Sequence, residues 1–132
     1  MSTVKPYLDS ALDHGVLVLT VLREQIEGED MADTLREELT AAVARHGVQR
    51  VVLDLSNTRY ISSIVFWPLL NLRRQLLEHD GSLIICGLRG PVQEVFTTTK
   101  MVNSAGSPNA PFEVAADRPQ AVARLARLHT AN

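Results

Sequence analysis

Residues 50–56 read RVVLDLS, a short run that is apolar apart from its two ends and one aspartate. Two valines and two leucines within seven residues predict a strand. After a polar loop, leucines recur at helical spacing and predict a helix that ends near Gly81; they are Leu69, Leu70, Leu72, Leu76 and Leu77. This part of the chain is therefore one strand followed by one helix.

The same order occurs before this unit. The run GVLVLTVL at residues 15–22 predicts a buried strand, and REQIEGED at residues 23–30 predicts a turn. A helix should follow, with Asp30 as its N-cap and Gly47 as its stop. Its apolar stripe consists of Leu35, Leu39, Ala42 and Val43.

The order continues after Gly81. SLIICGL at residues 82–88 predicts a third strand, and Pro91 suits the first turn of a helix that carries Val92, Val95 and Phe96. By composition, residues 103–111 form a loop. A short strand at 112–115 and a helix at 118–128 with Pro119 at its start complete the chain.

Four strand–helix units predict an α/β fold with a mostly parallel sheet, right-handed crossovers and about four helices, because each helix returns the chain to the same end of the sheet. We expect one domain over residues 1–132. Residues 4–12 could add an edge strand, followed by a turn at His14 and Gly15.

Composition excludes several classes of protein. The chain is 45% apolar and 21% charged, with a net charge of −2 spread along its length, which is typical of a globular domain and not of a nucleic-acid-binding surface. Its apolar runs are far shorter than the about 20 residues that span a bilayer. Cys86, the single cysteine, lies in an apolar strand and should be buried. The start of the chain lacks the pattern of a secretory signal, so we expect a cytoplasmic protein.

No motif for catalysis, metal or cofactor binding stands out. The seven glycines form neither a phosphate-binding loop nor a dinucleotide fingerprint, and the four histidines are scattered. Ser63 has Ile61 and Val65 where a nucleophile elbow has glycines. Glu27, Glu29 and Asp30 form an acidic cluster that can be a solvated helix start, a recognition surface or an acid–base pair.

Two serines stand at a strand-to-helix junction, in the stretch RYISSIVFWPLL at residues 59–70. In a parallel sheet this junction lies at the carboxyl edge, where functional groups gather. Ser62 or Ser63 can cap the helix through its hydroxyl. A serine there can equally carry a phosphate, which the positive end of the helix dipole would tolerate.

Three consecutive apolar side chains follow the serines. Val65, Phe66 and Trp67 span about 200° of a helix circumference, so at least one should be exposed and able to anchor another protein. Pro68 allows two possibilities: the regular helix begins around Trp67, or it is kinked there.

Four segments in this order resemble the STAS domain family, which includes bacterial anti-sigma factor antagonists and the cytoplasmic domains of sulfate transporters. They are RVVLDLSNTRYISS, LLNLRRQLLEHDGSLIICGL, GPVQEVFTTTKM and FEVAADRPQAVARL. The resemblance covers residues 15–128. It implies a mixed sheet of four or five strands, an antiparallel amino-terminal edge strand, helices largely on one face, and no catalysis or cofactor.

The resemblance also implies a regulatory site. The family's Asp-Ser-x-Gly stretch aligns with SSIV, which puts Ser63 at the phosphoacceptor position, Ser62 in place of the aspartate and Val65 in place of the glycine. Ser62 is the second candidate acceptor. The surface expected to bind the partner consists of Glu29, Asp30, Asn57, Thr58, Arg59, Ser62, Ser63, Phe66 and Trp67.

The partner that the resemblance implies is an anti-sigma factor with a kinase-type ATPase fold, which binds the unphosphorylated antagonist and releases the phosphorylated one. Nucleic acid and membrane insertion are not expected, and the free chain should be a monomer or a weak homodimer. One alternative is a constitutive STAS adaptor, such as a subunit of a lipid-transport ABC complex. Another is an enzyme that uses Ser63 or the acidic cluster.

Overall fold

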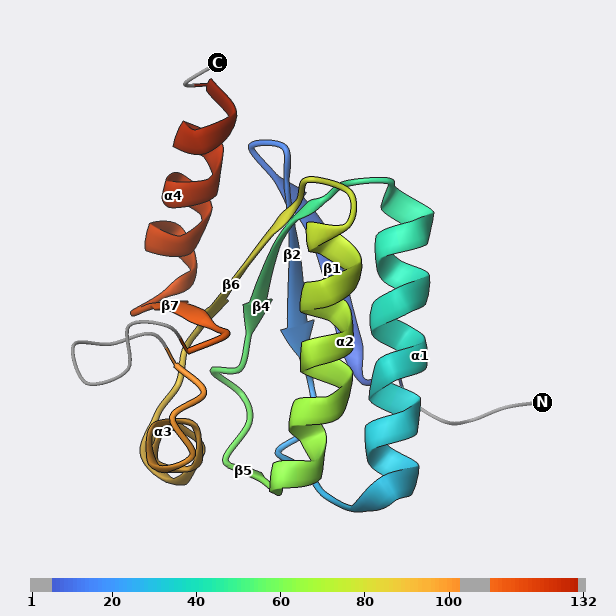
Figure 1. The fold of residues 1–132 in the computed structure, drawn as a ribbon, viewed down its shortest axis with the longest axis vertical. Helices are drawn as coiled ribbons and strands as arrows, with labels where there is room; N and C mark the ends of the chain where they lie inside the picture. The colour runs from blue at the N-terminus through green and yellow to red at the C-terminus, as the bar shows by residue number, and fades with distance from the viewer. Residues whose placement is uncertain (1–5, 103–109, 131–132) are drawn as a thin grey trace.

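A five-stranded mixed sheet forms the centre of the structure, a computed structural model that describes residues 6–102 and 110–130 (Figure 1). The strands stand in the order β1-β2-β4-β6-β7. Their bounds are β1 (Leu8–Asp13), β2 (Val16–Val21), β4 (Arg50–Asp54), β6 (Ser82–Cys86) and β7 (Glu113–Ala115). β1 pairs with β2 in antiparallel fashion, and every other pairing in this sheet is parallel. The predicted mostly parallel sheet with an antiparallel edge strand is confirmed.

A second, two-stranded sheet lies beyond the carboxyl edge of the first and was not predicted. It pairs β3 (Gln25–Ile26) with β5 (Tyr60–Ile61) in parallel. The amide groups of Arg59 and Tyr60 donate to the carbonyl of Glu24 at 2.6 and 3.1 Å. The segment predicted as a turn at 23–30 is thereby bonded to the loop that precedes the second helix.

Helices cover both faces of the central sheet. α1 (Gly28–His46) and α2 (Phe66–Leu77) lie side by side on one face, and both run upward from the carboxyl edge in Figure 1. α3 (Gly90–Thr98) lies at the carboxyl edge in contact with β5, and α4 (Arg118–Thr130) packs against β2, β4 and β6 from the opposite face. Three of the four helices contribute to one apolar layer, in line with the expectation of helices largely on one face, and α4 covers the other face because the strands are apolar on both.

The sheet separates two apolar layers. The larger one joins the sheet to α1, α2 and α3, and in it the ring of Phe96 meets those of Phe66 and Phe112 edge to face, at 5.0 and 6.1 Å between centroids. The smaller one lies under α4 and includes Cys86, which is fully buried as predicted. Each layer uses alternate residues of the same strands, because successive side chains of a strand point to opposite faces of the sheet.

The predicted helices are found, with shifted ends. α1 begins at Gly28 after Glu27, so Asp30 lies in the first turn and is not the N-cap; Gly47 ends the helix as expected. The buried stripe of α2 is narrower than predicted, because Leu77 is 51% exposed and Leu70 is half-buried. Pro91 stands in the first turn of α3, as predicted.

Two of the predicted segments reach beyond the described residues. Residues 4 and 5 of the edge strand lie outside them, and the observed strand β1 extends to Asp13, followed by the predicted turn at His14 and Gly15. Most of the predicted loop, residues 103–109, also lies outside the described part of the chain.

Candidate functional site

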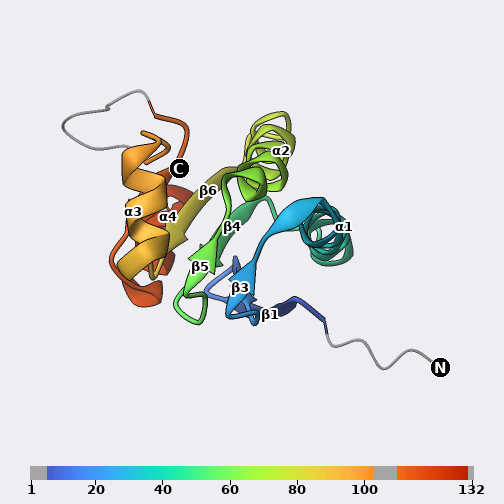
Figure 2. The same ribbon diagram turned by 90° about the horizontal axis from the view of Figure 1, so that it is seen from below.

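The predicted site residues come together at the carboxyl edge of the sheet, onto which Figure 2 looks. The loops after β2 and β4, the β3–β5 pair and the first turns of α1 and α2 meet there. A short 3-10 helix, η1 (Ser63–Val65), leads directly into α2. Residues 63–77 therefore form a continuous helical run that starts at this edge.

The two serines differ in exposure. The Oγ of Ser62 is buried and has no hydrogen-bond partner among the described residues, whereas Ser63 is exposed as the first residue of η1. The backbone holds Ser62, because its N–H donates to the carbonyl of Ile26 at 3.1 Å and its carbonyl accepts from the N–H of Val65 at 3.0 Å. Ser62 thus occupies the N-cap position of η1 without a cap bond from its side chain. Of the two hydroxyls, only that of Ser63 is open to another protein.

The apolar residues after the serines divide between core and surface. Val65 and Phe66 are buried at 2% and 4% exposure, while Trp67 is 74% exposed. The prediction that at least one is exposed is confirmed. Phe66, expected on the partner-binding surface, is a core residue instead, because its ring packs against Phe96. α2 begins at Phe66, so of the two possibilities the start near Trp67 is found, with Pro68 in the first turn of α2, where proline is tolerated.

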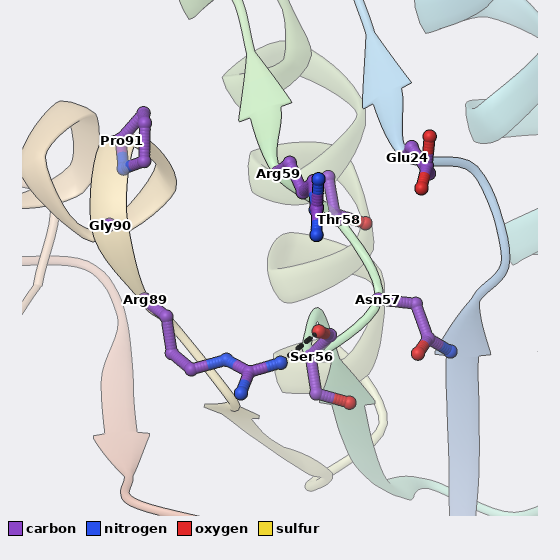
Figure 3. A pocket seen from close by; sticks show the side chains of 8 residues that line it. All are labelled: Glu24, Ser56, Asn57, Thr58, Arg59, Arg89, Gly90 and Pro91. Atoms are coloured by element: carbon purple, nitrogen blue, oxygen red, sulfur yellow. Dashed lines mark hydrogen bonds between the residues drawn. The ribbon is translucent and has the colours of Figure 1, made fainter.

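A pocket of about 600 Å³, which we call the loop pocket, opens between the β4–β5 loop and the start of α3 (Figure 3). Its lining consists of Glu24, Ser56, Asn57, Thr58, Arg59, Arg89, Gly90 and Pro91. Asn57 and Arg59 were predicted as partner-binding residues and are exposed here. Thr58, also predicted, is 5% exposed, and its hydroxyl donates to the carbonyl of Arg23 at 3.0 Å, so its role is to hold the loop.

Arg89 and Glu24 belong to the loop pocket but were missed by sequence reasoning. The guanidinium of Arg89 donates to the carbonyl of Ser56 at 2.6 Å across the pocket mouth. Arg89 stands just before the glycine that opens α3, at the carboxyl end of the third predicted strand. This position could have indicated Arg89 as a site residue from the sequence, because the carboxyl ends of neighbouring parallel strands meet at one edge of the sheet.

Close packing behind Ser56, one of the lining residues, fixes this part of the loop pocket. A carboxylate oxygen of Asp54 accepts the N–H of Ser56 at 2.9 Å, and Gly87 lies against this turn with a φ of +77°. A Cβ at Gly87 would stand 2.8 Å from both of these hydrogen-bonded atoms. The neighbouring thiol is held in its neutral form, because burial, and then the negative charge of Asp54, raise the pKa of Cys86 to about 12. Cys86 is therefore not a nucleophile at neutral pH.

A second concavity, of about 490 Å³, runs between α1 and α2; we call it the helix groove. α1 contributes Glu29, Ala32, Asp33 and Arg36, and α2 with the preceding η1 contributes Ile64, Trp67, Pro68 and Asn71. Glu29 and Trp67 were predicted partner-binding residues. Asp30 is exposed in the first turn of α1 but does not line the groove. The segment carrying Ser62 and Ser63 joins the loop pocket to the helix groove.

Among residues 6–102 and 110–130, no three His, Cys, Asp or Glu side chains stand close enough to hold a metal ion. Of the helices in these residues, none combines the length and the apolar character needed to cross a bilayer.

Sequence comparison gives a family and a named relative. The STAS domain family model matches residues 7–112. Over 93 residues the chain is 37% identical to BtrV of Bordetella bronchiseptica, named as a candidate anti-sigma factor antagonist; the match covers 66% of this chain and 79% of that protein.

Comparison of structures gives the same fold. An anti-sigma factor antagonist from Mycobacterium paratuberculosis superposes with a TM-score of 0.68 at 21% identity, over 89% of this chain and 92% of that one. The Bacillus cell fate determinant SpoIIAA, in its phosphorylated form, does so with a TM-score of 0.61 at 14% identity, over 89% and 97%. At these identities the likeness is one of fold. Together with the sequence match over residues 7–112, it leads to one conclusion: the chain belongs to the STAS domain family.

Proposed function

We propose that this chain is an anti-sigma factor antagonist that is switched by phosphorylation of Ser63. In its unmodified form it binds an anti-sigma factor of the kinase type, and the phosphorylated form releases that partner. The observation that carries the proposal is the contrast between the two serines: Ser63 is exposed at the start of a helical run, while the hydroxyl of Ser62 is buried. The sequence similarity to BtrV supports the same role.

The position of Ser63 explains how a phosphate could change binding without unfolding the chain. A phosphate adds a charge of about −1.5 to −2, and the N-terminus of a helix accommodates negative charge through its free N–H groups and its dipole. Ser63 is the first residue of the run that continues through α2. The modification would therefore alter the surface beside Trp67, where an incoming partner would meet the new charge.

The family's aspartate is absent at this site, since Ser62 occupies its position. An unmodified Ser63 thus lacks an adjacent acidic side chain on its amino-terminal side. We infer that the phosphate would be the first negative charge within residues 59–67, which contain no aspartate or glutamate.

We propose that residues 1–132 act as one non-enzymatic domain in the cytoplasm, without a cofactor, and as a monomer or weak homodimer when free. The raised pKa of Cys86, with its burial, removes the one thiol from consideration as a nucleophile.

The test is affinity capture from the native cells with three forms of the chain: wild type, Ser63→Ala and Ser63→Asp. We expect a kinase-type ATPase to bind the first two and not the third, and mass spectrometry to find phosphate on Ser63 of the unbound pool. Gln120→Asp is the matched control, because it adds the same charge at an exposed residue of α4 on the opposite face. Equal capture by wild type and Ser63→Asp would refute the switch, and capture of transporter subunits without phosphate would instead indicate a constitutive adaptor.

A further inference from the structure

We propose that the helix groove binds a protein segment that combines an apolar side chain with a lysine or arginine. The inference rests on the proposed function, since it assigns the chemistry of the partner at the same end of the molecule. It adds residues that the family resemblance did not supply, namely Asp33, Arg36 and Asn71.

The groove is built by two regular stripes. The residues from α1 are spaced 29, 32, 33 and 36, and those from η1 and α2 are spaced 64, 67, 68 and 71, so each set occupies one face of its helix. α1 and α2 start at the same end of the sheet and lie side by side (Figure 1). Seven residues of helix span about 10 Å, which matches about three residues of an extended chain.

The helix groove has an apolar floor and one highly exposed aromatic side chain beside it. Ala32 and Pro68 are buried, Ile64 is half-buried, and Trp67 is 74% exposed beside them. An exposed indole next to a preformed apolar floor offers a large area to a partner at little cost in side-chain entropy. This part of the groove fits an aliphatic or aromatic side chain.

The second requirement on the bound segment is its charge. Glu29 and Asp33 line the groove one turn apart, both exposed, and neither takes part in an ion pair within the residues described, 6–102 and 110–130. Glu27, just before α1, and Asp30, in its first turn, add negative charge near this end, while Arg36 stands one turn beyond Asp33. The end nearest the carboxyl edge of the sheet is therefore negative and the far end positive.

This polarity selects both the composition and the direction of the segment. A lysine or arginine would lie against Glu29 and Asp33, and an acidic or neutral residue against Arg36. A segment with the opposite order, or with acidic residues at the negative end, would meet like charge. Ser63 is not part of the lining, although it precedes Ile64, which is; a substitution at Ser63 therefore leaves every lining side chain in place.

Trp67 is the chain's only tryptophan, so its fluorescence reports on the groove directly. The test titrates the full chain with two tryptophan-free hexapeptides, one of alternating leucine and lysine and one of alternating leucine and glutamate. We expect the basic peptide to shift the emission to the blue in a saturable way and the acidic peptide to have no effect. The Glu29→Lys/Asp33→Lys variant should bind the basic peptide about tenfold more weakly. Added salt should weaken the wild-type interaction.

Two further variants separate this inference from the proposed function. Glu94→Lys, at an exposed residue of α3, reverses a charge outside the groove and should leave the peptide titration unchanged. Ser63→Asp should also keep the peptide affinity, within about twofold, even though it is expected to lose the kinase-type partner. Loss of the partner with retained peptide binding would thus support both proposals. Loss of the partner by Ser63→Asp, together with no binding of the basic peptide by the wild type, would leave the switch standing and overturn the groove.

Three outcomes would overturn the inference. The first is no change in Trp67 emission with either peptide. The second is equal binding of both peptides with no effect of Glu29→Lys/Asp33→Lys, which would mean apolar contact without charge selection. The third is a blue shift on raising the protein concentration alone, which would show that a second copy of the chain covers the groove.

Discussion

Replacing Gly87 by alanine should be among the most destabilising small changes in this protein, and Gly28→Ala is its matched control. Both glycines have a positive φ, +77° and +80°, so alanine suffers a similar backbone strain of about 1–2 kcal/mol at each position. At Gly28 no atom lies within 4 Å of the added Cβ. At Gly87 the Cβ would stand 2.8 Å from Oδ1 of Asp54 and from the backbone N of Ser56.

Relief of that contact requires the β4–β5 loop to move. Overpacking costs about 1–3 kcal/mol, and loss of the hydrogen bond between Ser56 and Asp54 costs about 1 kcal/mol more. We therefore expect Gly87→Ala to lower the free energy of unfolding by about 3–6 kcal/mol and Gly28→Ala by about 1–2 kcal/mol.

Urea unfolding followed by far-ultraviolet circular dichroism measures both changes, and the difference between the two variants is the quantity of interest. A difference of about 2 kcal/mol or more would support the argument. Equal losses of stability would refute it, because they would mean that the loop after β4 yields to a methyl group without cost. The part of the loop pocket that Ser56 lines would then be deformable, and packing against Gly87 would not hold it in place.

Three further predictions concern single side chains. Ser62→Ala should be neutral or stabilising by about 1 kcal/mol in the same urea assay, because it removes a buried hydroxyl without a partner; a loss of about 1 kcal/mol would mean that the hydroxyl caps η1 after all. Cys86 should resist thiol reagents in the folded protein at about pH 8 and react once urea unfolds the chain. Its pKa is raised from 9.0 to about 12, so the unfolded chain loses this proton first, and the stability due to Cys86 should fall as the pH rises above about 9; a Cys86→Ala variant with the same alkaline slope as wild type would contradict this. Trp67→Ala should change stability by less than about 0.5 kcal/mol, whereas Leu72→Ala, in the core, should cost about 2–5 kcal/mol; a large loss for Trp67→Ala would make the indole a core group.

Periodicity predicted the order of the main strands and helices because each of them buries a regular set of apolar residues. The apolar runs at 15–22, 50–56 and 82–88 form strands whose residues are mostly buried, and α1 buries its predicted stripe in full. The two-stranded sheet of β3 and β5 was beyond this reasoning. It consists of two residues on each side, held by backbone bonds between segments about 35 residues apart, and such bonds leave no pattern in side chains.

The candidate site was predicted in its location but not in its division between core and surface. Counting angles around a helix showed that Val65, Phe66 and Trp67 could not all be buried, yet it could not say which would be exposed. That choice depends on the ring of Phe96, which comes from α3. Likewise, the buried hydroxyl of Ser62 depends on the bond between its backbone and Ile26 in β3, a pairing that the sequence did not reveal.

The central sheet separates the candidate site from the apolar layer under α4. The residues of the loop pocket, the helix groove and the serine segment lie outside the smaller apolar layer under α4, which is built from the other face of the strands. Ala123 is exposed on the outer side of α4, and the native thiol is buried, so a cysteine introduced at Ala123 would be the one reactive handle on the folded chain. A dye, a surface or a tether attached there would hold the chain in a single orientation and leave the loop pocket and the helix groove, which α4 does not line, free for an arriving protein.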